Sequence, residues 1–447
     1  MITARTPDRS TARRVALPAL ADELRCRVVE TESQFLALES DWRSIGAKAP
    51  ASSSMAAWPW LVAWWETLGR RCPSTGLVGR PFVIVMEDAG EVVAIYPFVW
   101  HVEPSWSLRL RRLRPMGYAG HLEPSGLTEE PLTAVLPGFE ERGRRAVVEL
   151  VQRLVAQGRW DCAIVRQLEK EAQTESSNGQ PVIRVKVKTG PQKLVLPSDW
   201  QAFRKGLSKS MRDNLNYYPR LLTRAGHSYE VRVHTSPGEM DAAVGGLVEL
   251  HKERVWSECR NGHRDYFPEP TQEEMLRRAL RGMAAEGLGY VATLLVDGRE
   301  VASQAFLETD GRVTMHYSGF DPEFAKFSPL LVLQAEVLKQ AMARGVRQVN
   351  LLYGSAQWQK RWGAEPVEAE TRTLILSRRT MPLMRAALYA VKKEAIATLK
   401  RRGFSQWRGR AAVAASGLAS AGVDLHLLAI RTATSPALVH HLVRVHR

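Results

Sequence analysis

The sequence has only four cysteines and no long apolar run, and these shortages exclude several classes of protein. The cysteines are widely separated, with neither a CxxC pair nor the ligand spacing of a zinc site. No stretch approaches the roughly 18 uninterrupted apolar residues of a membrane-spanning helix. Residues 1–22 carry arginines but no apolar core, so we expect a flexible leader and not a secretory signal. These absences predict a cytoplasmic protein with reduced thiols and no metal site.

Acidic residues are scarce near the C-terminus, and this places most of the positive charge in one segment. The chain of 447 residues has a formal net charge of +15, and residues 378–447 hold thirteen Lys and Arg against two acids. The rest of the chain is close to balanced, so no DNA partner is expected. Residues 382–402 read as a basic amphipathic helix. Such a helix suits either peripheral contact with the inner face of a membrane or packing back onto the protein.

Two segments of the chain resemble each other and predict an internal repeat. Residues 82–98 read FVIVMEDAGEVVAIYPF and residues 290–306 read YVATLLVDGREVASQAF, so Gly90 aligns with Gly298. Both segments read as strand, glycine turn and strand, and Asp297-Gly298 is typical of a two-residue hairpin turn. In each copy helices precede the hairpin, and a third strand, a helix and a short strand follow it.

The repeat predicts an α/β (α+β) fold of two tandem units with a cleft between them, each a mixed, mostly antiparallel sheet flanked by helices. We expect an N-terminal unit over residues 23–190, a C-terminal unit over 191–377 and a basic helical extension over 378–447. The polar stretch 171–180 would link the two units. Helices are expected at 33–45, 55–69, 138–157, 199–225, 239–260 and 329–344, and Pro219 would kink or divide the fourth of them.

Several segments of the second unit resemble one family of enzymes. They include GLSKSMRDNLNYYPRLLTRAG at 206–226, LHKERVW at 250–256, HYSGFDPEF at 316–324 and GSAQWQKRWG at 354–363. These segments resemble acyltransferases of the GNAT superfamily, and most closely the CelD/BcsL-like proteins associated with cellulose and exopolysaccharide biosynthesis. The whole arrangement is similar to the tandem GNAT units of Fem-type peptidoglycan aminoacyltransferases.

The resemblance implies transfer of an acyl group from acetyl-CoA or another acyl-CoA to an amine or hydroxyl. The acceptor would be a small or carrier-linked sugar, lipid or peptide in polysaccharide or envelope assembly. No Cys or Ser stands in a recognisable nucleophile setting, so direct transfer is favoured over a covalent acyl-enzyme. Two alternatives stay open, namely a Fem-like transferase that uses aminoacyl-tRNA and a GNAT scaffold that has lost catalysis.

The implied coenzyme site lies where the strand at 313–319 leads into the helix at 329–344. Ser328 is a good N-cap and Pro329 suits the first helical position, so the exposed N–H groups there would hold a diphosphate. Leu330 stands where family members usually have Gly, and its side chain would hinder close approach of the ligand. Without a ligand the same segment reads as a well-capped core helix. The implied coenzyme-binding residues are Met315, Ser318, Ser328, Pro329, Leu330 and Leu331.

Three residues are candidates for the chemistry of transfer. The resemblance implies that a backbone N–H of the strand, at Met315, His316 or Tyr317, stabilises the oxyanion of the thioester. His316 is a candidate base because histidine titrates near neutral pH. Strand alternation predicts that His316 and Tyr317 do not both face the cleft. Glu253 resembles a residue of the acceptor cleft, although a solvated helix face explains it equally well.

Residues expected near the acceptor are more scattered. They are Arg254, Arg212, Tyr353 and Lys360. The basic helix over 204–224 reads as a solvated face, as a contact for a phosphate-bearing carrier, or as a tRNA contact. In the last family motif Asn350 replaces an acid and Gln359 a lysine, which removes both partners of an ion pair together. This change suggests either an altered acceptor or lost activity.

Overall fold

The computed structural model describes most of the two expected units. It covers residues 24–49, 53–71, 76–105, 108–117, 128, 132–169, 182–187, 191–258, 265–352, 357–367 and 370–377. The expected leader (1–22), linker (171–180) and basic extension (378–447) lie outside the described residues, and so does Tyr353.

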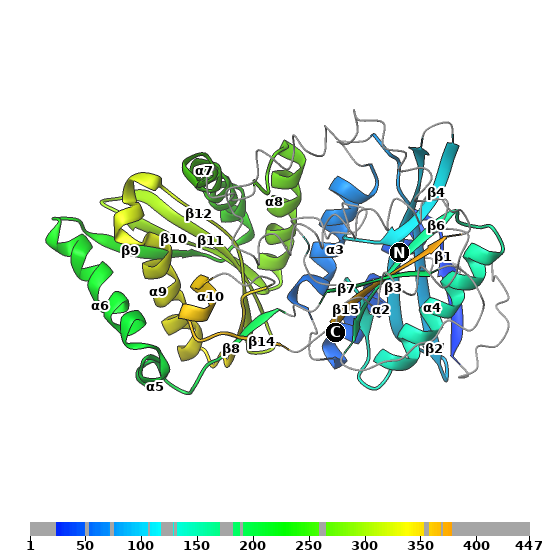
Figure 1. Ribbon diagram of the computed structural model, residues 1–447, viewed down its shortest axis with the longest axis horizontal. Helices are drawn as coiled ribbons and strands as arrows, with labels where there is room; N and C mark the ends of the chain where they lie inside the picture. The colour runs from blue at the N-terminus through cyan, green and yellow to red at the C-terminus, as the bar shows by residue number, and fades with distance from the viewer. Residues whose placement is uncertain are drawn as a thin grey trace, which may run out of the picture.

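The first unit is a sheet flanked by helices and occupies the right side of Figure 1. Its strands have the order β1-β2-β3-β4-β6-β15-β7, with β5 paired to β3. All its ladders are antiparallel except the one between β4 and β6. The elements are β1 (Arg25–Val29), α1 (Glu32–Leu36), α2 (Glu39–Lys48), η2 (Ser54–Ala56), α3 (Trp58–Trp64), η3 (Trp65–Gly69), β2 (Arg80–Asp88), β3 (Glu91–Ser105), β4 (Leu108–Pro115), β5 (Ala134–Val135), α4 (Glu140–Ala156), β6 (Cys162–Glu169) and β7 (Val182–Val187).

The second unit repeats this plan on the left of Figure 1, with strand order β14-β8-β13-β12-β11-β10-β9. Only β12 and β13 pair in parallel among its ladders. The two units confirm the expected fold class. The elements are β8 (Gln192–Val195), α5 (Trp200–Gly206), α6 (Lys209–Arg224), β9 (Tyr229–His234), η4 (Pro237–Glu239), α7 (Met240–Glu258), α8 (Pro270–Ala285), β10 (Gly289–Val296), β11 (Arg299–Thr309), β12 (Arg312–Phe320), η6 (Pro322–Phe327), α9 (Pro329–Ala343), β13 (Gln348–Asn350), α10 (Gln357–Arg361) and β14 (Glu365–Pro366).

The second sheet is covered on both faces, which explains why its central strands are almost wholly apolar. Every residue of β10 is buried. Val291 belongs to a core shared with α7 and α8, whereas its neighbour Ala292 belongs to a core shared with α5, α6 and α9. Alternate residues of a strand point to opposite faces, so a strand between two helical layers needs apolar residues throughout.

The last described strand, β15 (Glu370–Ser377), follows the second unit in sequence but pairs in the sheet of the first. It lies between β6 and β7 and is antiparallel to both. The chain therefore returns to the first unit after completing the second. The sheet of the first unit therefore includes β15, which comes from the end of the range 191–377 expected for the second unit. The boundary expected at residue 377 remains a prediction.

Matching backbone irregularities support the internal repeat. The hairpin turns at Ala89-Gly90 and Asp297-Gly298 both have positive φ at their two central residues, as a type I′ turn requires. The first hairpin has a register shift after Met86 and the second has one after Leu294. These two residues also align in the sequence repeat, so both copies carry the same bulge.

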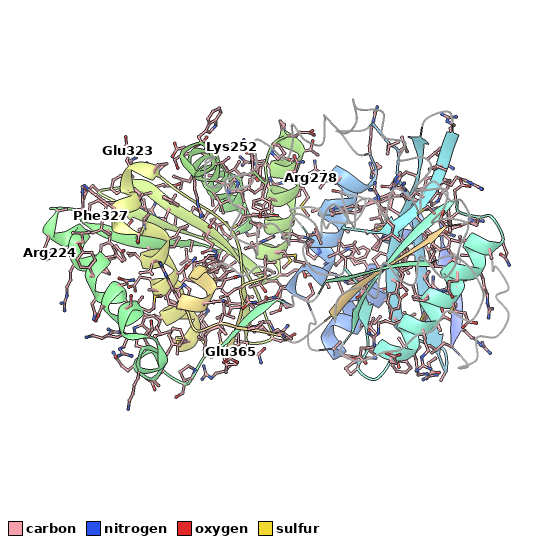
Figure 2. The ribbon with its side chains drawn as sticks, viewed as in Figure 1. Arg224, Lys252, Arg278, Glu323, Phe327 and Glu365 are labelled. Atoms are coloured by element: carbon pink, nitrogen blue, oxygen red, sulfur yellow. The ribbon has the colours of Figure 1, made fainter. Side chains whose placement is uncertain are left out.

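The two units meet along a packed core. Helices α3 and α8 lie side by side between the sheets (Figure 1), and one apolar cluster includes side chains of both units. The Ser54 hydroxyl lies 3.0 Å from that of Thr314 across the boundary. Arg278, labelled in Figure 2, forms an ion pair with Glu66 at 3.1 Å. The sequence predicts a cleft between the units. Along α3 and α8, however, a continuous apolar core joins the two units.

Two helix expectations need correction. The helix expected over 199–225 is two helices, α5 and α6, separated at Leu207 and Ser208. Ser208 caps α6 by accepting a hydrogen bond from the Met211 N–H at 3.3 Å, so a new helix begins there. Pro219 does not divide the helix, because α6 continues through it to Arg224. The helix expected over 55–69 is likewise a series of short pieces, η2, α3 and η3.

Candidate functional site

The strands β12 and β13 diverge shortly after they begin to pair. Their parallel ladder joins Arg312 to Gln348, Val313 to Val349 and Thr314 to Asn350, and it ends there. Strand β12 continues to Phe320, still paired with β11 on its other side. From Met315 onward, β12 therefore does not pair with β13 in the described part of the chain, and this is the segment expected to hold a coenzyme.

A β-bulge interrupts β12 at the same point. The ladder with β11 pairs Phe306 with Met315 and then Gln304 with Ser318, so β12 has one residue more than its partner in this interval. The additional length lies at His316 and Tyr317. Because a bulge breaks strand alternation, these two rings stack on each other with centroids 4.1 Å apart. The expectation that they point to opposite faces was wrong for this reason.

Aromatic side chains surround the bulge on the side of the first unit. Trp60 of α3 lies against His316 with ring centroids 5.3 Å apart. Tyr266 and Phe267 lie 5.1 Å and 5.0 Å from the ring of Tyr317. The imidazole of His316 is consequently buried, with 7% of the residue exposed. A proton acceptor at this position would act in a low-dielectric environment.

A second buried histidine, His251 of α7, was not singled out by the sequence analysis. Its Nδ1 lies 3.1 Å from the carbonyl oxygen of Ser318, and its Nε2 accepts a hydrogen bond from the Tyr266 N–H at 3.3 Å. A carbonyl can only accept, so the proton must reside on Nδ1 and the ring is neutral in this arrangement. The one sequence signal was its place in LHKERVW, two residues before the chosen Glu253.

Close approach of α7 to β12 depends on Gly319. A Cβ added to this residue would lie 2.2 Å from the backbone nitrogen of His251, a distance that real structures essentially never show. The absence of a side chain thus lets α7 lie directly on the end of β12. This contact sets the place of His251 beside Ser318.

The start of α9 differs from the expected capped helix. Ser328 precedes it with φ 48° and ψ 57°, in the left-handed region, and its side chain makes no capping hydrogen bond. The sequence prediction of a Ser328 side-chain cap was therefore wrong, because a capping serine needs extended backbone angles. The carbonyl of Ser328 instead accepts from the N–H groups of Leu331 and Val332, at 2.9 Å and 3.3 Å. Pro329 has no N–H. The backbone N–H of Leu330 is therefore the first-turn donor that does not bond to the Ser328 carbonyl.

Charge distinguishes this helix start from its counterpart in the first unit. The first turn of α9 has no acidic residue, and Lys326 precedes it with its Nζ 4.9 Å from the Phe327 ring centroid. The counterpart α4 begins with Glu140 and Glu141. A phosphate is attracted to a helix N-terminus but repelled by carboxylates placed there, so α9 suits an anion and α4 does not.

The side chain of Leu330 lies partly buried against the core of the second unit, as does that of Leu331. Leu330 is therefore packed at least partly away from solvent at the helix start. Ser328, whose hydroxyl does not cap the helix, precedes Leu330 by two residues. The structure thus offers the Leu330 N–H, a hydroxyl and a nearby ammonium group to an anion.

Glu253 and Arg254 lie near the far end of β12, beyond the bulge. Burial raises the pKa of the Glu253 carboxyl, the negative charge of Asp321 raises it further, and Arg299 opposes the rise. The guanidinium of Arg254 lies over the ring of Phe320, 5.1 Å from its centroid. Of the predicted catalytic residues, His316 and Tyr317 come together at the bulge. The charged groups that act on Glu253 lie past the end of β12.

The other predicted acceptor residues occupy different places. Arg212 donates hydrogen bonds to the carbonyls of Leu207 and Lys205, the latter at 3.4 Å, at the end of α5. Lys360 is exposed on α10. Arg212 thus bonds to the end of α5. Among the described residues, no hydrogen bond or ion pair links Arg212 or Lys360 to the bulge.

Asn350 and Gln359, which replace a charged pair of the family motif, bond to backbone. The Oδ1 of Asn350 accepts from the Leu352 N–H at 2.9 Å, and the Nε2 of Gln359 donates to the Leu351 carbonyl at 2.8 Å. Leu352 has a positive φ of 58°. The two amides therefore hold the turn that follows β13, a role that needs no charge.

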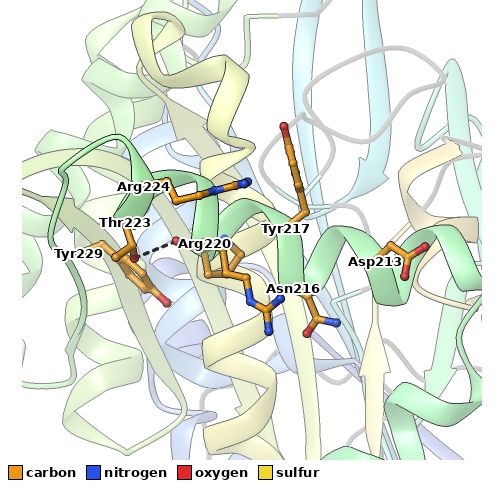
Figure 3. Close-up of a pocket in the computed structure, with 8 residues that line it drawn as sticks. Asp213, Asn216, Tyr217, Arg220, Thr223, Arg224 and Tyr229 are labelled. Atoms are coloured by element: carbon orange, nitrogen blue, oxygen red, sulfur yellow. Dashed lines mark hydrogen bonds between the residues drawn. The ribbon is translucent and has the colours of Figure 1, made fainter.

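A groove lined by both polar and apolar groups runs along α6 and has a volume of about 820 Å³. Figure 3 shows Arg220 and Arg224 one turn apart on this face, with Tyr217 and Tyr229 beside them. Neither arginine forms an ion pair with a described carboxylate, and the Arg224 guanidinium lies 5.7 Å from the Tyr217 ring centroid. The groove includes none of the residues expected to bind coenzyme.

Among the described residues, no group of three or more His, Cys, Asp or Glu is placed to hold a metal ion. Within the same ranges no helix is both long and apolar enough to cross a membrane. The chemistry of the site thus rests on backbone groups and on a few side chains.

Comparison with known proteins gives matches among solved structures but none among curated proteins. No curated protein is significantly similar to the chain. Among solved structures, FemX is 11% identical with a TM-score of 0.46, covering 75% of this chain and 95% of its own. A tandem GNAT protein from the clavulanic acid pathway is 12% identical with a TM-score of 0.41, covering 79% and 99%. L-PGS from Bacillus licheniformis is 13% identical with a TM-score of 0.40, covering 76% and 96%.

A family model provides the sequence-level match. Residues 209–360 match the family described as acetyltransferase (GNAT) domain. The matched segment includes β12, the bulge and the start of α9, and it covers less than half of the chain. The second unit therefore carries a GNAT-type domain, and the chain is a transferase.

Proposed function

We propose that the second unit transfers an acyl group from acetyl-CoA or another acyl-CoA to an amine or hydroxyl. The observation that carries this proposal is the divergence of β12 from β13 beside the bulge at His316 and Tyr317, within the segment that matches a GNAT domain. Amides of the pantetheine arm would add to the edge of β12 from Met315 to Ser318, as a peptide adds to a sheet edge. The diphosphate would lie at the start of α9, where Ser328, Leu330 and Lys326 provide donors.

The bulge would supply the groups for the chemical step. A backbone N–H there would stabilise the negative charge that develops on the thioester oxygen. The imidazole of His316 is our candidate to accept the proton of the attacking amine or hydroxyl. Glu253 and Arg254 lie near Asp321. They would interact electrostatically with charged groups of a bound ligand and not with the reacting atoms. We place the acceptor among sugars, lipids or peptides of polysaccharide or envelope assembly, following the resemblance to CelD/BcsL-like proteins.

Calorimetry with acetyl-CoA and with CoA tests the first part of the proposal. We expect both to bind, and we expect release of CoA thiol when an amine or hydroxyl acceptor is added. A variant Leu330→Asp serves as the site control, because an acid in the first turn favours the helix but repels a diphosphate. Absence of binding by either ligand to the full chain would reject the acyl-CoA proposal.

A second candidate function is transfer from aminoacyl-tRNA, and the groove on α6 is the observation that favours it. Arg220 and Arg224 line the groove with two guanidinium groups, beside exposed Tyr217, and Asp213 is the carboxylate that lines it with them. Such groups suit phosphates, and the aromatic ring suits stacking on a base. If acyl-CoA fails to bind and aminoacyl-tRNA binds, this candidate replaces the first. If neither binds, a scaffold without catalysis is the remaining interpretation.

A further inference from the structure

Three buried side chains form a hydrogen-bonded chain that ends at the bulge. The Nε1 of Trp362 donates to the Oε1 of Gln334 at 3.1 Å, and the Nε2 of Gln334 donates to the Oε1 of Gln304 at 2.9 Å. The Nε2 of Gln304 then donates to the carbonyl oxygen of His316 at 3.1 Å. The chain crosses from the segment after α10 through α9 and β11 to β12.

The direction of this chain is set at one end by chemistry. An indole nitrogen can only donate, so Trp362 requires that Gln334 present its carbonyl oxygen, and its amide nitrogen must then face Gln304. The same logic turns the amide nitrogen of Gln304 toward His316. Trp362 and Gln304 are each 2% exposed and Gln334 is 7% exposed, so water does not compete freely for these bonds. Reversing any one amide would leave a buried acceptor facing another acceptor, at a cost of about 1–3 kcal/mol.

The chain has a consequence for the peptide group between His316 and Tyr317. In a trans peptide the C=O and N–H point in opposite directions. No peptide among the described residues is cis, so Gln304 holds the His316 carbonyl on its own side and directs the Tyr317 N–H to the opposite side. We infer that Trp362, Gln334 and Gln304 are positioning residues, which aim the Tyr317 N–H at the acyl oxygen of a bound thioester.

The first unit provides an internal comparison. Tyr96 occupies the position of Gln304 in the sequence repeat, and its hydroxyl forms no hydrogen bond with a described residue. That hydroxyl would lie 2.5 Å from a Cβ added to Gly143 of α4, so the side chain is directed to the helix. The β3–β4 ladder begins at Phe98–Pro115, the counterpart of Phe306–Met315, so Tyr96 lies outside it. The amide chain that begins at Gln304 thus has no counterpart at Tyr96 in the described part of the first unit.

This inference rests on the proposed function for the bound thioester. The orientation of the peptide group between His316 and Tyr317 is a property of the protein without a ligand, so it is tested without one. The dipeptide His316-Tyr317 is the one place in the sequence where Tyr follows His. Labelling all histidine carbonyls with ¹³C and all tyrosine nitrogens with ¹⁵N therefore gives a single ¹³C–¹⁵N correlation, which reports this peptide group alone.

Removal of the chain should change that signal in a graded way. We expect Gln304→Leu to move the His316 carbonyl resonance upfield most, Gln334→Leu less and Trp362→Phe least, because each variant lies one bond further from the carbonyl. Trp160→Phe is the matched control, since Trp160 is a buried indole whose Nε1 has no described hydrogen-bond partner. Equal signals in all four variants and the unaltered protein, or an equal shift from Trp160→Phe, would overturn the inference.

A second arm separates this inference from the proposed function. Acetyl-CoA should shift the Tyr317 N–H of the unaltered protein, and CoA without an acyl group should not. Complete loss of an oxyanion donor lowers kcat by about 10²–10³-fold, so Gln304→Leu should lower kcat toward that range with the Kd for CoA unchanged. No binding of acetyl-CoA would reject the proposed function and leave the first arm valid. Binding and turnover with kcat unchanged in Gln304→Leu would reject the positioning role.

Discussion

Trp60 of the first unit lies against His316 of the second, with ring centroids 5.3 Å apart. The indole Nε1 of Trp60 also donates to the Thr128 hydroxyl at 3.1 Å, which ties the ring to its own unit. A residue of each unit therefore meets at the bulge of β12. The first unit forms a wall of the candidate site, even though only the second unit matches a transferase domain.

Truncation of Trp60 should affect both stability and the site. Trp60→Ala removes a fully buried indole, and such truncations cost about 3–5 kcal/mol of unfolding free energy. Trp60→Phe keeps a ring beside His316 and loses only the hydrogen bond to Thr128, at about 1 kcal/mol. Denaturant unfolding of the two variants checks the difference. Equal losses in both would contradict a stabilising contribution from the aromatic ring beside His316.

The start of α9 gives a prediction about affinity for coenzyme. Leu330→Gly should tighten binding of CoA, because it removes the side chain beside the N–H expected to face the diphosphate. Leu330→Asp should weaken it through charge repulsion at the same place. Calorimetry with CoA measures both variants. Opposite changes support a diphosphate at this helix start, and identical affinities in both variants would contradict it.

Glu253 should make stability depend on pH in a defined direction. Its pKa is raised in the folded protein by burial and by Asp321, so the folded state favours the neutral carboxyl over the charged one. The stability gained from the neutral form is complete below the ordinary pKa of glutamate, about 4.3, and is lost as pH rises through the raised pKa. Glu253→Gln should therefore be more stable than the unaltered protein at neutral pH and equal to it at low pH.

Thermal unfolding as a function of pH checks this expectation. Glu253 is exposed, so solvent screening keeps the difference small. Glu230→Gln on β9 is a suitable control, because Glu230 is also exposed and forms an ion pair with Arg232 at 2.8 Å. A stability advantage of Glu253→Gln over the unaltered protein that is larger at low pH than at neutral pH would have the wrong sign.

Gly319 should tolerate no side chain. In Gly319→Ala the new Cβ would meet the backbone of His251 and of Leu250, at 2.2 Å and 2.4 Å, and backbone cannot move aside cheaply. Overpacking of this kind typically costs about 1–3 kcal/mol. Gly238→Ala is the matched control, since a Cβ there meets nothing within 4 Å. Urea unfolding should show a loss for the first variant and little change for the second.

Much of the architecture was predictable from local patterns. The mostly apolar segment 290–296 and the Asp297-Gly298 turn located the hairpin of the second unit, and the repeat located its counterpart. The bulge at His316 and Tyr317 was not predictable, because one additional residue in a strand leaves no mark in an apolar pattern. Its position depends on pairing with β11, which is tertiary information. The same holds for β15, whose partners in the first sheet lie far away in the sequence.

The site shows the same division between local and distant causes. Ser328 and Pro329 were expected at a helix start, and α9 does begin at Pro329. The left-handed angles of Ser328 follow from the preceding turn η6, which ends when the Ser328 N–H donates to the Ala325 carbonyl at 3.0 Å. Gln304 and Gln334 were not predicted to belong to the site, because a glutamine in a sequence carries no sign of burial. Only the fold brings their amides to Trp362 and His316.

The groove on α6 gives the prediction that separates the two candidate functions. Replacing Arg220 and Arg224 together by Glu reverses two charges that line the groove. If the groove contacts phosphates of a tRNA, the double variant should lower affinity for aminoacyl-tRNA and reduce the dependence of that affinity on salt by about two contacts. Acetyl-CoA binding should not change, because the groove includes none of the residues expected at the coenzyme site.

The matched control reverses an exposed charge of the other unit. Arg145→Glu on α4 changes one exposed arginine, which lies 3.4 Å from Glu141, without touching the groove. Filter binding of aminoacyl-tRNA at several salt concentrations, beside calorimetry with acetyl-CoA, gives both readouts on the same proteins. Loss of tRNA binding only in the double variant favours a groove that binds polyanions. Equal binding in all three proteins means that the arginines of α6 form a solvated face.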